Sequence, residues 1–192
     1  FGWPQNVELM SSDSKQRMEA DSARMVQEAM KQAGINSDEP VALIGHSQGG
    51  IVAATIASDL KDDYDVKHVA TAGSPVANHP IPDKTWVTSV EMDDELVAAL
   101  DGAPNPNSEH WLTVRGTASK SDNNPKSTFA GTPVIDAPDN KEITHWLKYH
   151  QAAYQNATDM GSSAMKTHEQ HFDEILDGDL QEVMYFEGRM SK

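Results

Sequence analysis

The hexapeptide GHSQGG at residues 45–50 contains a GxSxG pattern, the spacing that places a serine on a sharp turn between a strand and a helix. The apolar run VALI at 41–44 precedes it, and small and apolar residues follow from Ile51. Glycines beside the serine let strand and helix backbones approach without a clashing side chain. The first N–H groups of the following helix favour negative charge, so the backbone N–H of Gln48 is a candidate oxyanion donor. Ser47 is therefore the candidate nucleophile, and a turn that merely joins two elements is the alternative.

A serine hydroxyl is a weak nucleophile at neutral pH, so the chain must also supply a histidine base and an acid. In enzymes built on this turn, the order along the chain is nucleophile, acid, histidine. Of the eight histidines, His145 and His150 follow all the expected strands, whereas His46, His68 and His110 are expected to be structural. A separation of five residues on one helix turns two side chains about 140° apart, so only one of the late pair can face the nucleophile well.

The acid is expected at the carboxyl end of a strand, because the sites of parallel sheets lie there. The segment EMDDELVAALDG at 91–102 follows a β-branched run at 85–91 that predicts a strand. Its first carboxylates after the strand, Asp93, Asp94 and Glu95, are the candidates. Acids are also favoured in the first turn of a helix, so a solvated helix start is the alternative explanation for this run.

Short strand-like runs alternate with helical periodicity along the whole chain. This alternation predicts an α/β architecture, a mostly parallel sheet with flanking helices. Residues 116–140 are polar and rich in Ser, Asn, Asp, Pro and Gly, which indicates a long loop or flap within one domain portion spanning 1–192. Residues 41–60 form the expected nucleophile strand, turn and helix. The expected strands are 7–10, 41–44, 66–72, 85–91 and 111–114, and the expected helices are 14–33, 51–60, 141–160 and 164–176.

The segments VALIGHSQGG at 41–50 and EMDDELVAALDGAPN at 91–105, followed by Trp111, resemble the α/β-hydrolase superfamily, and within it the lipase-like serine hydrolases of actinobacteria. Such relatives carry a pattern of the type EHxxDxVPALDGxPN, whose Asp is the acid of the catalytic triad. Aligning LVAALDG to this pattern puts Glu95 at the acid position, with Asp94 one residue earlier. The resemblance therefore implies that one of these two is the acid, and Glu can serve this role in the fold.

The relatives also carry a histidine four or five residues before a tyrosine, in an H…Y…T pattern. His150, Tyr154 and Thr158 match it. The resemblance, which covers about residues 15–160, thus favours His150 as the base, with His145 as the alternative.

Complete relatives have several strands before the nucleophile strand, and one of the loops there supplies the second oxyanion donor. Residues 1–40 offer room for one strand and one helix only. We therefore expect the N-terminal strands of the fold to be missing from this chain. The rest of a longer polypeptide, or a pairing chain, is the expected partner that supplies them, since an open central strand invites aggregation.

The composition excludes several other partners. The 192 residues include 30 acidic and 15 basic side chains, and the formal net charge of −15 repels nucleic acids and anionic membranes. No apolar run approaches the roughly 18 residues of a membrane helix. The absence of cysteine removes thiolate nucleophiles and sulfur ligands. We expect a soluble protein, with secretion favoured over other compartments.

Neither a metal nor a cofactor is expected. His168 and His171 are three residues apart, whereas the HExxH zinc motif separates its histidines by four, so a solvated polar helix explains them better. GHSQGG also lacks the lysine of a phosphate-binding loop.

These residues together predict a serine hydrolase that cleaves small-molecule or lipid esters through an acyl-enzyme. Ser47 attacks, His150 transfers the proton, Glu95 or Asp94 orients the imidazole, and the Gln48 N–H binds the oxyanion. Acyl transfer to an alcohol uses the same machinery and is one alternative. An interaction domain that has kept the hydrolase scaffold without activity is the other, because a fold alone does not determine function.

Overall fold

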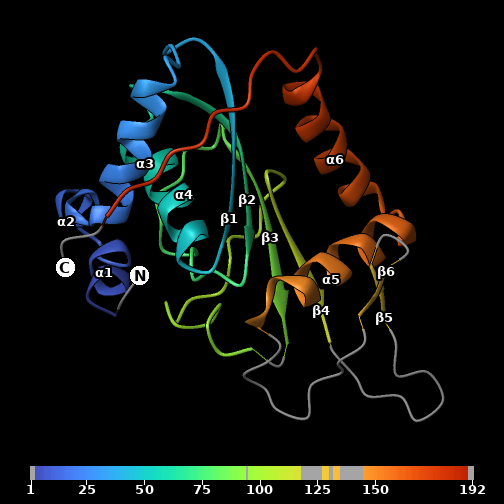
Figure 1. The fold of residues 1–192 in the computed structure, drawn as a ribbon. Coiled ribbons are helices and arrows are strands. Elements are labelled where there is room, and N and C mark those ends of the chain that lie inside the picture. The colour runs from blue at the N-terminus through green and yellow to red at the C-terminus, as the bar shows by residue number, and fades with distance from the viewer. Residues whose placement is uncertain (1–2, 94, 118–126, 130–131, 135–144, 190–192) are drawn as a thin grey trace.

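A four-stranded parallel sheet forms the centre of the protein, in the order β1-β2-β3-β4. In this computed structural model, which describes residues 3–93, 95–117, 127–129, 132–134 and 145–189, helix α4 packs on one face of the sheet and helices α5 and α6 lie on the other (Figure 1). The strands are β1 Pro40–His46, β2 Asp65–Ala72, β3 Trp86–Met92 and β4 Trp111–Gly116, and these helices are α4 Gln48–Asp59, α5 Leu147–Met160 and α6 Ser163–Leu176. The predicted α/β architecture with a mostly parallel sheet is confirmed.

Helix α4 is buried on nearly all sides because its residues are small or apolar around the whole circumference. Ile51 and Ile56 are at most 2% exposed and pack in one core with strand residues Val66, Val69 and Val87. A second core lies across the sheet, where Val90, Val114, Tyr149, Ala152 and Met165 join β3 and β4 to α5 and α6. The sheet is therefore packed on both faces, as a parallel sheet requires.

The strand predicted over 7–10 is wrong, since helix α1 spans Trp3–Leu9. Gln5 and Leu9 lie four residues apart and are buried at 1% and 0% exposure, whereas Val7 between them is 64% exposed. Burial of positions i and i+4 follows the period of a helix, and the short apolar pair in the sequence did not reveal it.

The single helix predicted over 14–33 is divided into α2 Ser14–Glu19 and α3 Asp21–Gln32. Ala20 adopts extended backbone angles (φ −63°, ψ 127°) and breaks the helix while remaining fully buried. Gly34, with a φ of 75°, follows the end of α3, in the conformation that commonly ends a helix.

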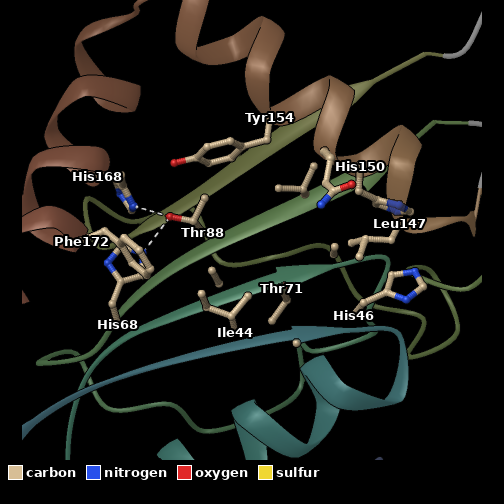
Figure 2. Close-up of a pocket in the computed structure, with 15 residues that line it drawn as sticks. Ile44, His46, His68, Thr71, Thr88, Leu147, His150, Tyr154, His168 and Phe172 are labelled. Atoms are coloured by element: carbon tan, nitrogen blue, oxygen red, sulfur yellow. Dashed lines mark hydrogen bonds between the residues drawn. The ribbon is translucent and has the colours of Figure 1, made fainter. Parts of the chain in front are cut away.

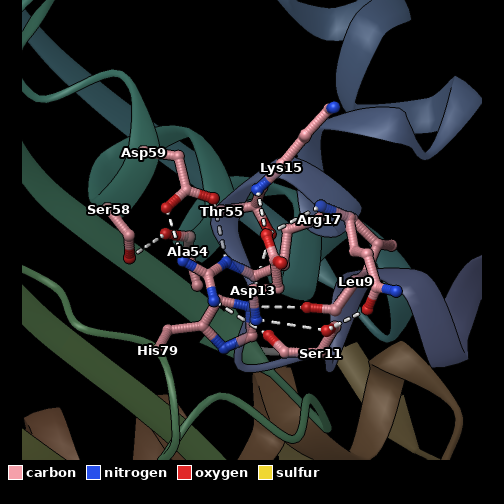
Figure 3. Close-up of polar contacts among 11 residues, drawn as sticks. Leu9, Ser11, Asp13, Lys15, Arg17, Ala54, Thr55, Ser58, Asp59 and His79 are labelled. Carbon is pink, nitrogen blue, oxygen red and sulfur yellow. Dashed lines mark hydrogen bonds and ion pairs between the residues drawn. The ribbon is translucent and has the colours of Figure 1, made fainter.

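A buried ion pair fastens the N-terminal helices to α4 (Figure 3). The guanidinium of Arg17 donates from Nε and Nη2 to the Asp59 carboxylate at 2.8 and 2.5 Å, and from Nη1 to the Ser11 carbonyl at 2.8 Å. Nearby, the Nε2 of His79 lies 3.0 Å from the Leu9 carbonyl. Two parallel bonds between guanidinium and carboxylate fix an orientation as well as a distance, so α2 is held in register with the helix that follows the GxSxG turn.

The segment predicted as a flap over 116–140 lies largely outside the described residues. Its described part contains β5 Ser127–Phe129 and β6 Thr132–Val134, which pair in antiparallel fashion. Helix α5 begins at Leu147, six residues later than predicted, and residues 141–144 lie outside the described part of the chain.

Strand β1 lies at the edge of the sheet, with β2 as its single neighbour among the described residues. The side chain of Ile44 on this strand is 74% exposed. That further strands from outside this chain adjoin β1 stays a prediction. None of the helices in the described residues combines the length and the apolar character that a membrane crossing requires.

Candidate active site

The turn between β1 and α4 holds Ser47 in a strained conformation. Ser47 has a φ of 55° and is the one residue other than glycine with a positive φ in the described chain. Such a conformation typically costs about 1–3 kcal/mol and persists only when its surroundings enforce it. Here the Ser47 N–H donates to the Ala72 carbonyl at 2.8 Å, and the Ser74 hydroxyl donates to the Ser47 carbonyl at 2.8 Å. Two hydrogen bonds with residues at the end of β2 therefore hold the turn in its strained conformation.

Two glycines make the close approach of the backbone segments around this turn possible. A Cβ at Gly45 would collide with the backbone of Gly49, and a Cβ at Gly50 would collide with the Ser74 hydroxyl. A Cβ at Gly49 would meet nothing within 4 Å. The close approach expected of the GxSxG glycines thus depends on a missing side chain at Gly45, and also at Gly50 just outside the pentapeptide.

Three side chains form a continuous chain of hydrogen bonds at the carboxyl ends of β1 and β3. The Ser47 Oγ lies 2.9 Å from the Nε2 of His145, and the Nδ1 of His145 lies 2.6 Å from the Oε1 of Glu95. Because a carboxylate only accepts, the Nδ1 donates to it, which leaves Nε2 to accept from the hydroxyl. This is the arrangement in which an imidazole can take a proton from a serine.

His150 lies on the other oxygen of the same carboxylate. Its Nε2 is 2.6 Å from the Oε2 of Glu95, and its Nδ1 is 3.2 Å from the Trp146 carbonyl. No hydrogen bond joins His150 to Ser47 among the described residues. The structure therefore places His145, the alternative, and not the favoured His150, against the Ser47 hydroxyl.

The expectation that both histidines lie on one helix does not hold. His145 precedes α5, and Trp146 is its N-cap residue. A residue that precedes the helix does not follow the rotation of 100° per residue that separates side chains within the helix. Both rings can therefore reach one carboxylate, one from the helix and one from the loop before it.

The Glu95 carboxylate is 1% exposed and ionised. Burial alone would raise its pKa, but the hydrogen bonds from His145 and His150 and their positive potential outweigh burial and lower the pKa to about 2. Asp94, the other acid candidate, lies outside the described residues. Asp93 is turned toward β4, where it accepts from the Thr117 hydroxyl at 2.8 Å.

Gly73, at the end of β2, forms the floor under these three groups and was not singled out from the sequence. A Cβ at this position would lie 2.6 Å from Glu95 Oε1, 2.8 Å from His150 Nε2 and 3.0 Å from His145 Nδ1. Its φ of 58° also favours glycine. The available signal was the run Gly73-Ser74-Pro75 directly after a predicted strand.

His46, the residue before the nucleophile, steadies the loop that carries His145. Its Nε2 donates to the His145 carbonyl at 2.7 Å, and the two rings lie 4.9 Å apart. Burial lowers the pKa of His46, with the positive potential of His145 and His150 acting in the same direction and the bond to the carbonyl opposing it. His46 therefore serves as a neutral donor.

Gln48 supplies the first N–H of α4, at a position where helices leave their N–H groups without intrahelical acceptors. Its side chain is buried, and its Nε2 donates to the side-chain Oδ1 of Asn6 at 2.5 Å. Helix α1 is thus joined to the start of α4, a contact that the sequence did not predict.

A cavity of about 460 Å³ lies on the sheet face beneath α5 and α6 (Figure 2). One end reaches His46 and His150, and Ser47 is not among the lining residues. Ile44, Val90, Leu147 and other apolar side chains form much of the wall between the two ends. Most of the polar groups that line it are hydrogen-bonded, several of them to residues outside the lining, so the cavity offers mainly apolar surface.

The opposite end of the cavity is closed by histidines around Thr88. The Thr88 hydroxyl lies 2.9 Å from His68 Nε2 and 3.1 Å from His168 Nδ1. His168 is 3% exposed, and the His171 ring stacks on Trp86 at 4.4 Å. The solvated helix expected at these positions is wrong for His168, because α6 lies across the sheet and directs this side chain inward. Among the described residues, no group of three or more His, Asp or Glu side chains is arranged to hold a metal ion.

A comparison with protein-family models matches residues 6–129 to the PGAP1-like alpha/beta domain. The match covers more than half of the chain and includes both Ser47 and Glu95. It ends before His145 and His150. No curated protein and no solved structure matches the chain.

Proposed function

Because the chain belongs to the PGAP1-like alpha/beta domain family, which has an α/β-hydrolase-like fold, we propose that it is a serine hydrolase that cleaves carboxylic esters through an acyl-enzyme. The observation that carries the proposal is the unbroken sequence of hydrogen bonds from Ser47 through His145 to Glu95. The strained backbone at Ser47 supports it, since strain of this kind concentrates at active sites. The actinobacterial type stays a prediction.

In the proposed reaction, His145 Nε2 takes the proton of Ser47 as the Oγ attacks the ester carbonyl. The ionised Glu95 stabilises the imidazolium that forms and fixes its Nδ1–H. Collapse of the tetrahedral intermediate expels the alcohol, which receives the proton from His145. Water then attacks the acyl-enzyme with the same histidine as base, and the acid is released.

The oxyanion of each tetrahedral intermediate lies at the start of α4 in this proposal. The Gln48 N–H points from the first turn of that helix, where the helix dipole also favours negative charge. Removing one such donor in other hydrolases lowers kcat by about 10²–10³-fold.

The substrate in this proposal is a small-molecule or lipid ester without a strong negative charge. The chain carries a net charge of −15, which disfavours anionic substrates. The mainly apolar cavity that ends at His46 and His150 supports an apolar group near the site. Its volume lies within the usual range of ligand pockets, roughly 300–1,000 Å³.

Hydrolysis of p-nitrophenyl acetate and butyrate by Ser47→Ala tests the proposal. We expect the variant to lose turnover by several orders of magnitude, because residues of a triad act as a unit. Ser58→Ala is the matched control, since Ser58 is buried in α4 and donates to the Ala54 carbonyl at 2.7 Å. Equal turnover in the wild type and Ser47→Ala would refute the proposal. No turnover in a folded wild type would also refute it and would favour an inactive interaction domain.

A further inference from the structure

The proposed triad uses one of the two histidines on Glu95 and leaves His150 without a role. His150 is 1% exposed, in the first turn of α5. Its two ring nitrogens face a carboxylate oxygen and a backbone carbonyl, both of which are acceptors. Both nitrogens must therefore donate, which a histidine does only when its ring holds both protons.

We propose that His150 is a positioning residue, an imidazolium that holds Glu95 Oε2 so that Oε1 remains directed at the Nδ1 of His145. This inference rests on the proposed function, because it assigns a task within that triad. His150 touches neither the nucleophile nor the reacting atoms. It acts through the carboxylate.

The geometry of the carboxylate carries this inference. Its two oxygens are divided between the histidines at equal distances of 2.6 Å, and the two rings stand at 90° with their centroids 6.2 Å apart. Among the described residues, these histidines are the only side chains that hydrogen-bond Glu95. Without His150, Oε2 would be buried with no donor, and the carboxylate would be able to rotate away from His145.

The charge of His150 affects the same step. The titratable groups that face the His150–Glu95 pair are His145 from the loop before α5, His46 from β1 and, through Glu95, Glu91 from β3. A positive charge at His150 opposes a second one on His145 and so favours return of the proton to the leaving alcohol. Removing His150 also removes a hydrogen bond that lowers the pKa of Glu95. Both effects move the acid limb of the pH–rate profile to higher pH.

The test compares His150→Ala and His150→Gln with His79→Gln, in which another buried histidine, at 6% exposure on the α4 side of the sheet, is replaced. Rates of p-nitrophenyl ester hydrolysis are divided by the active-site count from burst titration, so that unfolded protein does not enter. We expect His150→Ala to lower kcat about 10–100-fold and to move the acid limb upward by about half a pH unit or more. His150→Gln, which keeps one donor, should lie between it and the wild type.

An unchanged kcat per active site and an unchanged pH profile in His150→Ala would overturn the proposal. A second readout does not depend on activity. In ¹⁵N-labelled wild-type protein, both ring nitrogens of His150 should carry protons at pH 7, and a neutral ring would also overturn it. A wild type that gives no burst, with a doubly protonated His150, would instead refute the proposed function and leave the pairing with Glu95 intact.

Discussion

Two histidine clusters reach opposite ends of one cavity, through His150 at one end and through His68 and His168 at the other (Figure 2), and they differ in a single kind of partner. The carboxylate cluster consists of His145, His150 and Glu95, and the far cluster consists of His68, His168 and His171 around Thr88. In the carboxylate cluster, both histidines share an ionised acid. In the far cluster, the described hydrogen-bond partners are a hydroxyl, a backbone carbonyl and another histidine.

This difference separates their chemistry. In the far cluster, burial lowers the pKa of His68 to about 3, with the positive potential of His171 and His168 acting in the same direction. A histidine with so low a pKa is too weak a base to take a proton from a serine hydroxyl at neutral pH. In the carboxylate cluster, the ionised carboxylate of Glu95 can stabilise an imidazolium. Histidines thus serve packing at one end of the cavity and, in our proposal, proton transfer at the other.

The two clusters lie at different positions along β2 and β3, and this difference explains why only one of them contains an acid. His68 lies halfway along β2 and Trp86 begins β3, whereas Gly73 and Glu95 follow the ends of the same two strands. In parallel sheets, the loops after the strands are free to carry functional residues, and the opposite edge serves stability. The carboxylate cluster lies on the first of these edges.

The largest contrast is expected between His145→Ala and His171→Ala. Loss of the proposed base should lower kcat/KM for a p-nitrophenyl ester by roughly 10⁴-fold or more. His171 contacts His68 and Trp86 in the far cluster, so its loss should change kcat/KM less than about threefold. Comparable losses in the two variants would show that the clusters do not differ in the way described.

An intermediate effect is expected from Gly73→Ala. The new Cβ would press on Glu95 Oε1 and on both histidines, and a displacement near 1 Å at a reacting centre can cost about 10²-fold in rate. Gly34→Ala is the matched control, because Gly34 also has a positive φ but nothing within 4 Å of the added Cβ. Thermal unfolding should show about 1 kcal/mol of destabilisation from the backbone conformation in both variants, with the steric clash adding to it in Gly73→Ala. A loss of kcat/KM confined to Gly73→Ala is the expected result.

The smallest effect on activity, and a distinct effect on stability, is expected from His68→Gln. The folded protein holds the pKa of His68 at about 3, below its ordinary value of 6.5. As the pH falls below 6.5, His68 therefore becomes protonated in the unfolded chain but stays neutral in the folded protein. The free energy of unfolding consequently decreases until about pH 3. His68→Gln removes this contribution, which amounts to about 1.4 kcal/mol per pH unit at most.

Urea unfolding at pH 7 and pH 4.5 measures this prediction. The wild type should lose more free energy of unfolding between the two pH values than His68→Gln does. Equal losses would indicate that His68 is protonated in the folded protein, and the contrast between the clusters would then weaken.

The sequence was most informative where the chemistry is local. Ser47 was singled out as the candidate nucleophile because a strand, a sharp turn and a helix follow one another within some twenty residues, and the glycine spacing has one physical reason. The alternation of apolar runs likewise predicted β1 to β4 in order, because strands buried on both faces have continuous apolar sequences. The PGAP1-like match agrees with this part of the chain.

Residues brought together from separate elements were harder to predict. Whether His145 or His150 reaches Ser47 depends on where α5 begins, and helix starts are poorly marked when no capping side chain is present, as at Trp146. The need for a glycine at position 73 depends on its contacts with Glu95 and the two histidines, which come from separate elements of the fold. The helix α1 was missed because its buried face comprises few residues. Secretion, acyl transfer as the alternative reaction, and Asp94 as the alternative acid all stay predictions.

Covalent labelling of the wild-type protein with a fluorophosphonate tests the central claim most directly, since such reagents react with a serine only when a neighbouring base activates it. Mass spectrometry should find a single adduct on Ser47. The adduct should be lost in His145→Ala and retained, at a reduced rate, in His150→Gln. An adduct on another serine, or undiminished labelling of Ser47 in a folded His145→Ala, would contradict the assignment of Ser47, His145 and Glu95 as a catalytic triad.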